Sequence, residues 1–175
     1  MAPNFKFKIL NSGPGFIFLE VIVAMALLGI VFVFLLGVGT SVLGISKSIQ
    51  KELAADSLLK ESMESLRSFK NSTEWPVDGL GAVNYGEENP YSLILEENES
   101  GQLVWQLVLG PDQAGGFSRK IIFDKVSRQA TSGDIEPVYN ASNNDEDTVK
   151  ATVVVYDDLK QYRISAYFTN WLIVE

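Results

Sequence analysis

The sequence predicts an α+β protein in which one long N-terminal helix is followed by a small antiparallel β-sheet. Two patterns predict this class. From residue 16 to about residue 70, apolar residues are first continuous and then spaced by three and four, as on a helix. After residue 90, short alternating segments are separated by turn residues, as in antiparallel strands. We therefore expect the second half of the helix to lie on the sheet.

The first half of the predicted helix, residues 16–46, is apolar enough to span a membrane. Val21–Ser46 is a run of 26 residues without a charged side chain, and a bilayer core requires about 20 apolar residues in a helix. An ordinary signal peptide has a shorter apolar stretch and a small-residue cleavage site after it, and no such site follows here. Lys6 and Lys8 precede the segment. Basic residues favour a cytoplasmic N-terminus, which would place the rest of the chain outside.

The predicted helix continues through residues 47–70 with an amphipathic pattern. Its apolar stripe consists of Ile45, Ile49, Leu53, Leu59, Met63, Leu66 and Phe69. A membrane anchor needs only the first half of the helix, so a buried stripe in the second half indicates packing against the chain's own head. Asn71-Ser72-Thr73 and Pro76 are expected to end the helix, because proline disfavours helix at the residue before it.

Residues 71–175 are predicted to form a β-rich head. The five expected strands are Ser92–Glu97, Gln102–Leu109, Phe117–Ser127, Val149–Tyr156 and Gln161–Val174. Residues 98–101 and 157–160 have the composition of hairpin turns. Alternation predicts that Val149, Ala151, Val153 and Val155 share one buried face, as do Tyr162, Ile164, Ala166 and Phe168. Residues 129–148 are polar and are expected to form a connection.

Composition excludes several classes of function. The chain carries 14 basic and 22 acidic residues, a net charge of −8, and neither cysteine nor histidine. Nucleic-acid binding requires clustered Lys and Arg, which this acidic head lacks. Without Cys and His, disulfides, most transition-metal sites and the usual nucleophile–base pairs are unavailable. We expect no enzyme activity, no catalytic residue and no cofactor.

Calcium binding is the one metal site that the sequence raises. Asp145 and Asp147 lie near Asn143, but their spacing does not match the calcium loop D-x-[DN]-x-[DN]-G. We therefore interpret this stretch as a solvated turn and expect no metal site.

A short motif stands where the apolar segment begins. The residues from Ser12 to Ala24 read SGPGFIFLEVIVA, with Gly15 before Phe16 and Glu20 four residues later. This motif resembles the class III signal of type IV prepilins and pseudopilins. The resemblance implies that residues 1–15 are a leader cleaved between Gly15 and Phe16 by a prepilin peptidase, which also methylates the new amine of Phe16. The family's basic residue before the glycine is replaced here by Pro14, which bears on processing efficiency.

Glu20 also has a physical interpretation of its own. A carboxylate inside a membrane helix costs about 2.5–3.5 kcal/mol on insertion scales and usually marks a function that involves a partner. In a stack of helices, Glu20 of one subunit can pair with the Phe16 amine of its neighbour and set the axial register. The alternative is that Glu20 extends to the headgroup level near the helix end. Glycines such as Gly37 and Gly39 either mark a place where helical order is lost on assembly or are merely tolerated in lipid.

The resemblance implies a filament subunit. The fold is expected to be pilin-like, and the final strand resembles that of minor pilins of the PilV or GspI type. The implied function is that of a minor pilin or pseudopilin in the cytoplasmic (inner) membrane, with its head outside, which an assembly platform builds into a type IV pilus-like filament. The implied partners are the prepilin peptidase, other pilin subunits, the platform and the membrane. The alternative function is a monomeric, membrane-anchored extracytoplasmic binding module that keeps its first 15 residues.

Overall fold

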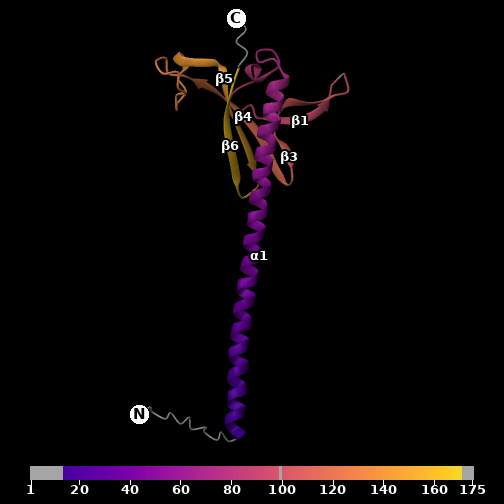
Figure 1. The fold of residues 1–175 in the computed structure, drawn as a ribbon, viewed down its shortest axis with the longest axis vertical. Coiled ribbons are helices and arrows are strands. Elements are labelled where there is room, and N and C mark those ends of the chain that lie inside the picture. The colour runs from indigo at the N-terminus through magenta and orange to yellow at the C-terminus, as the bar shows by residue number, and fades with distance from the viewer. Residues whose placement is uncertain (1–13, 99, 171–175) are drawn as a thin grey trace, which may run out of the picture. The chain divides into compact units, whose positions relative to one another are not determined.

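The computed structural model describes residues 14–98 and 100–170 of the chain, with side chains from residue 17 onward. The chain divides into two compact units, Met1–Gln50 and Lys51–Glu175. Helix α1, Pro14–Ser72, belongs to both units (Figure 1). Its first residue is a proline, which is tolerated at the start of a helix because the missing N–H would have no intrahelical acceptor there. The predicted long helix is confirmed, with ends within two residues of those expected.

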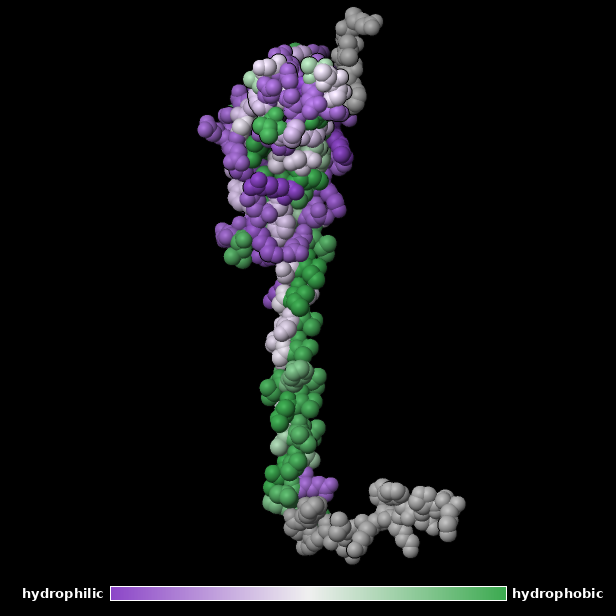
Figure 2. Space-filling model, turned by 90° about the vertical axis from the view of Figure 1, so that its left-hand side faces the viewer, coloured by the Kyte–Doolittle hydropathy of each residue, from purple (hydrophilic) through white to green (hydrophobic). Residues whose placement is uncertain are grey.

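The first unit consists, in its described part, of the apolar portion of α1. Every described side chain from Ile17 to Gln50 is exposed. One helix in the described chain is long and apolar enough to cross a membrane, and none of its most apolar stretch is buried. Figure 2 shows hydrophobic residues covering most of the visible face of this unit. The described part of this unit therefore has a largely apolar surface and no buried side chain.

The second unit contains a six-stranded antiparallel sheet. Its strands are β1 Tyr91–Glu97, β2 Leu103–Leu109, β3 Asp112–Ala114, β4 Phe117–Ser127, β5 Asn144–Tyr156 and β6 Gln161–Thr169. The strand order is β2-β1-β4-β5-β6, and β3 pairs with β4 outside this path. Two short 3-10 helices, η1 Leu80–Ala82 and η2 Ala141–Asn143, lie in the connections. The α+β class is confirmed.

The part of α1 that begins at Lys51 lies along one face of this sheet (Figure 1). Its buried apolar residues are Ala55, Leu59, Met63, Leu66 and Phe69, and they pack in one core with the inward residues of β4 and β5. Phe123 is fully buried within this core, and its ring meets Tyr91 edge-on with 5.5 Å between ring centroids. Val149, Ala151, Val153 and Val155 are all fully buried, as their alternation predicts.

Five details differ from the sequence expectations. Ile45, Ile49 and Leu53 are exposed, so the buried stripe begins only at Ala55. In edge strand β6, Ile164 is exposed on the face predicted to be buried, whereas Phe168 of the same strand is buried. The structure also contains a short strand, β3, that the sequence did not predict. Strand β6 ends at Thr169, before Asn170, and residues 171–174 of the predicted strand lie outside the described residues.

The fifth difference concerns the polar stretch before Val149. Strand β5 begins at Asn144, five residues earlier than expected, so the solvated-turn interpretation of Asp145 and Asp147 is wrong. A register shift between Lys125 and Val126 in β4 lets Asn144 and Asp145 pair with the end of that strand. Residues 146–148 of β5 have no partner in β4 at this point, so the irregularity places three extra residues in β5. Extra residues in one strand of a pair increase the local twist.

Candidate functional site

The residues predicted to direct processing and assembly lie in the first unit. Gly15 and Phe16 are in the first turn of α1, and leader residues 1–13 lie outside the described part of the chain. Glu20 lies one turn further along and is exposed. The structure thus places Gly15, Phe16 and Glu20 on one continuous helix, and the proposed Glu20–Phe16 pair would join two different chains.

Glu20 is the one acidic residue in the described part of the first unit, and Lys47 is the one basic residue there. Within the described residues, the side chain of Glu20 makes no hydrogen bond or ion pair. Its neighbours along the helix are large exposed side chains such as Ile17 and Val23. A lone carboxylate on an otherwise apolar surface is costly in lipid and gains most from a cation supplied by a partner.

The glycines of the apolar helix are not required by packing inside this chain. A Cβ atom placed at Gly29, Gly37, Gly39 or Gly44 would meet nothing within 4 Å. The carbonyl oxygen of Gly37 accepts hydrogen bonds from Thr40 Oγ1 at 2.9 Å and from Ser41 Oγ at 3.0 Å. Side-chain bonds of this kind compete with the helical ladder and often bend a helix. These bonds add to the low helix propensity of Gly37 and Gly39 at this point of the apolar helix.

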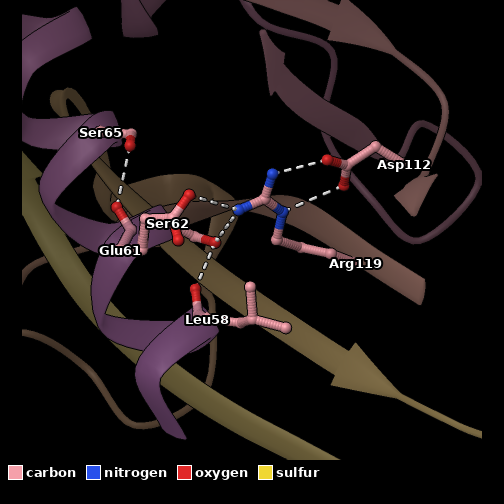
Figure 3. Close-up of polar contacts among 6 residues, drawn as sticks. All are labelled: Leu58, Glu61, Ser62, Ser65, Asp112 and Arg119. Carbon is pink, nitrogen blue, oxygen red and sulfur yellow. Dashed lines mark hydrogen bonds and ion pairs between the residues drawn. The ribbon is translucent and has the colours of Figure 1, made fainter. Parts of the chain in front are cut away.

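In the second unit, a buried arginine joins the helix to the sheet (Figure 3). Arg119 of β4 is 8% exposed. Its Nε donates to Asp112 Oδ1 at 3.0 Å and its Nη2 to Asp112 Oδ2 at 2.6 Å. Its Nη1 donates to Ser62 Oγ of α1 at 3.1 Å and lies 3.6 Å from Glu61 Oε1. The hydrogen bond to Asp112 is the main reason that the pKa of Arg119 is raised above its usual value.

This arginine cluster explains two features of the sequence. Ser62 is buried on the head-facing side of α1, and its hydroxyl donates to the carbonyl of Leu58 at 2.6 Å while accepting from Arg119. Strand β3 carries Asp112 into reach of Arg119 through the register pair that the two residues form. A bidentate guanidinium–carboxylate pair is the geometry in which a partly buried charge is best compensated.

A second polar contact holds the β5–β6 turn against the start of the head's helix. Lys51 Nζ lies 3.4 Å from Asp157 Oδ2, and Lys160 Nζ lies 2.6 Å from Glu52 Oε1. Asp157 also caps its own turn, accepting from the backbone N–H groups of Leu159 and Lys160 at 2.9 and 2.7 Å. These backbone bonds lower the pKa of Asp157. The pairs lie at the surface, so each is worth little by itself.

A third cluster fixes the loop that follows β4. Arg128 donates to Asp145 Oδ2, to Thr148 Oγ1 and to the carbonyl of Gly133. Burial by itself would raise the pKa of Asp145, but hydrogen bonds from Thr148 and Arg128 outweigh it and leave the pKa below its usual value. Asp145 is thus paired with Arg128. In the described parts of the chain, no group of three or more acidic side chains is placed to hold a metal ion.

Sequence reasoning missed the arginine cluster, although a signal for it was present. Phe117, Arg119, Ile121 and Phe123 alternate along β4 and therefore share its inward face. A charged residue at an inward position must find a partner, and the acid seven residues earlier, Asp112, was the nearest one before it in the sequence.

Comparisons of the chain with models of protein families, with curated proteins and with solved structures gave no match.

Proposed function

We propose that this chain is a structural subunit, a minor pilin or pseudopilin, of a type IV pilus-like filament. After removal of residues 1–15 by a prepilin peptidase, the mature chain begins at methylated Phe16 and stays in the inner membrane with its head outside. An assembly platform then transfers it into the filament, where its apolar helix packs against those of other subunits. It has no catalytic role in this account.

One observation carries the proposal. The described part of α1 is exposed from Ile17 to Gln50, carries the single acid Glu20, and belongs to the helix whose later residues form the core of the head. A helix that only anchors a domain has no need of an acid in its apolar segment or of a second half that enters the core. An apolar surface of this length must be covered by lipid or by other helices. Both environments are used in turn by a subunit that moves from membrane to filament.

Glu20 supplies the specificity that apolar packing lacks. Lipid tails are as apolar as leucine side chains, so helices in a membrane gain little from hydrophobic burial alone. Cleavage before Phe16 creates an α-amine close to Glu20 along the helix. Pairing of the two groups between subunits would offset the cost of burying each charge and select one axial offset.

The head's contacts with α1 suit a subunit that is pulled out of a membrane. Ser62 and Glu61 of the helix hold Arg119 of the sheet, and Lys51 and Glu52 hold the β5–β6 turn. These contacts fix the helical part of the second unit to its sheet. The Gly37 carbonyl, which accepts two side-chain hydrogen bonds, belongs to the first unit. A loss of helical order there would therefore leave the head intact.

Mass spectrometry of the N-terminus tests the proposal. The protein is purified from cells with and without a prepilin peptidase. We expect a chain that starts at methylated Phe16 in the first case and at the leader in the second. A chain that keeps residues 1–15 in both strains would contradict the proposal and favour the membrane-anchored binding module.

A further inference from the structure

A groove on the head is lined by three tyrosines and is separate from the helix–sheet contacts described above. We call it the tyrosine groove, and its rings are Tyr85, Tyr139 and Tyr167. Asp124 of β4, Lys150 of β5 and Tyr167 of β6 lie opposite one another in register and form one row across three strands. The cavity has a volume of about 440 Å³, within the range of about 300–1,000 Å³ that holds small ligands.

Another wall of the groove comes from the loop after β4. The backbone N–H of Glu136 donates to the carbonyl of Ser127 at 2.9 Å, and the backbone N–H of Asn140 donates to Ser127 Oγ at 3.0 Å. Arg128 holds the same loop through the Gly133 carbonyl at 2.9 Å. The groove is therefore bounded by hydrogen-bonded backbone in the loop as well as in the sheet.

Glu136 has an unused acceptor. Its Oε1 accepts a hydrogen bond from Asn143 Nδ2 at 2.9 Å, which fixes the carboxylate. Its Oε2 is buried, and no described residue donates to it. An unsatisfied buried acceptor costs about 1–3 kcal/mol, so such atoms in a native structure require an explanation. A ligand in the groove that donates an O–H or N–H group would satisfy it.

The charges that line the groove are already balanced. Lys150 Nζ lies 3.5 Å from Asp124 Oδ2. Lys125 Nζ lies 5.4 Å from the centroid of the Tyr85 ring, at cation–π distance. Together with Glu136, the lining has two basic and two acidic side chains. A ligand with a net charge would therefore meet no excess of counter-charge, which favours a neutral ligand.

The tyrosines favour a ligand with flat apolar faces as well as polar edges. Tyr139 is 43% exposed and Tyr167 is 50% exposed, so their rings are available to a ligand. A tyrosine offers an apolar ring and a polar hydroxyl. Together with a carboxylate acceptor, these rings match a molecule that carries many hydroxyl donors around C–H faces.

We propose that the tyrosine groove binds a neutral carbohydrate, one of whose hydroxyl groups donates to Glu136 Oε2 while sugar faces stack on the tyrosine rings. The site is confined to the head and does not depend on assembly of the chain into a filament. Failure of this proposal would leave the proposed function untouched, and the reverse also holds.

Saturation-transfer difference NMR tests the proposal on the full-length chain. The chain is kept in a detergent without a sugar headgroup, such as an amine oxide, and is mixed with lactose, cellobiose, maltotriose and chitobiose. We expect transfer to at least one of them at millimolar concentration. The absence of transfer to all four, or preferential binding of a lysine-rich peptide, would overturn the proposal.

Two pairs of variants locate the binding. Glu136→Gln keeps an oxygen for Asn143 but turns the unused acceptor into a donor, so we expect at least a tenfold weaker affinity with an unchanged melting temperature. Glu88→Gln, an exposed acid outside the groove lining, is its matched control. Tyr167→Ala on the edge strand should also weaken binding, whereas Tyr156→Ala in β5 should not. Equal affinity of Glu136→Gln and Glu88→Gln, or of Tyr167→Ala and Tyr156→Ala, would refute the assignment.

Discussion

Replacing Asp112 by Asn removes the counter-charge of a buried guanidinium while keeping the shape of the side chain. In the native head, the two carboxylate oxygens of Asp112 accept from Arg119 Nε and Nη2 at 3.0 and 2.6 Å. The asparagine side chain could accept one of these bonds, and its amide NH₂ group would face the second donor. Arg119 would then be left with Ser62 and with Glu61 at 3.6 Å.

The expected loss of stability follows from the burial of the pair. Breaking one partner of a fully buried ion pair costs about 3–5 kcal/mol. The side chain of Arg119 is 10% exposed, but that of Asp112 is 23% exposed, and Glu61 supplies a second, weaker charge. We therefore expect Asp112→Asn to lower the free energy of unfolding by about 2–3 kcal/mol.

Urea unfolding of the full chain in detergent micelles, followed by tryptophan fluorescence, measures this change. Trp75 is buried in the head's core and reports on its unfolding, and the midpoint gives the change in free energy at constant slope. Lys120→Met is the matched control, because Lys120 follows Arg119 and points to the other face of β4. Its loss should stay within about 1 kcal/mol, the scale of its contact with the Tyr156 ring.

The double variant Asp112→Asn with Arg119→Met makes the reasoning refutable. Removing the arginine as well removes the uncompensated buried charge, so the double variant should be more stable than Asp112→Asn alone. If the two losses simply added, or if Asp112→Asn were as mild as Lys120→Met, the arginine cluster would not hold the helix to the sheet.

Three further predictions concern the head. Phe123→Ala should lower the free energy of unfolding by about 3–5 kcal/mol, because it empties a fully buried part of the core, and a loss below about 1 kcal/mol in urea would contradict the assigned core. Gly81→Ala should lower it by about 1–3 kcal/mol, since the new Cβ would lie 2.6 Å from the Trp75 carbonyl oxygen; an unchanged melting temperature would speak against this close approach. The pKa of Asp145 is lowered in the folded head, so its contribution is present above the unfolded pKa of about 3.9 and is lost as pH falls through the folded value. Asp145→Asn should therefore flatten the loss of stability in acid as the pH falls below about 3.9, and an equally steep loss in variant and native chain would refute the pairing with Arg128.

The helix was predictable because its pattern is long and continuous. Leu59, Met63, Leu66 and Phe69 are buried as their spacing predicts. Leu53 fits the same stripe but is exposed, because periodicity shows which face is apolar and not how far the sheet extends beneath it. The sequence could therefore predict the direction of the buried face but not the residue at which burial begins.

The polar contacts of the head were harder to predict than its strands. The start of β5 has the composition of a turn because residues 143–148 are mostly Asn, Asp and Glu. It becomes a strand because the register shift between β4 and β5 and the pairing of Asp145 with Arg128 provide partners from other parts of the chain. Likewise, Glu136 became notable only when the loop placed its carboxylate against Asn143 and left one oxygen buried. Such arrangements depend on tertiary contacts that no local pattern encodes.

The candidate assembly residues, in contrast, could be located from the sequence, but their role could not be tested by the structure. The positions of Gly15, Phe16 and Glu20 were evident from the sequence, and the structure adds that all three lie in one helix whose described apolar surface is exposed. The proposed pairing joins two chains, so the role of these residues stays a prediction that requires measurement in cells.

The fraction of chains recovered in sheared filaments tests the central claim most directly. Glu20→Gln keeps the size of the side chain but removes the charge, and Lys47→Gln is the control at the other end of the apolar helix. We expect both variants to insert in the membrane at native levels, with Lys47→Gln recovered in filaments and Glu20→Gln largely absent from them. Recovery of Glu20→Gln at the native level would contradict an assembly that depends on the Glu20 carboxylate.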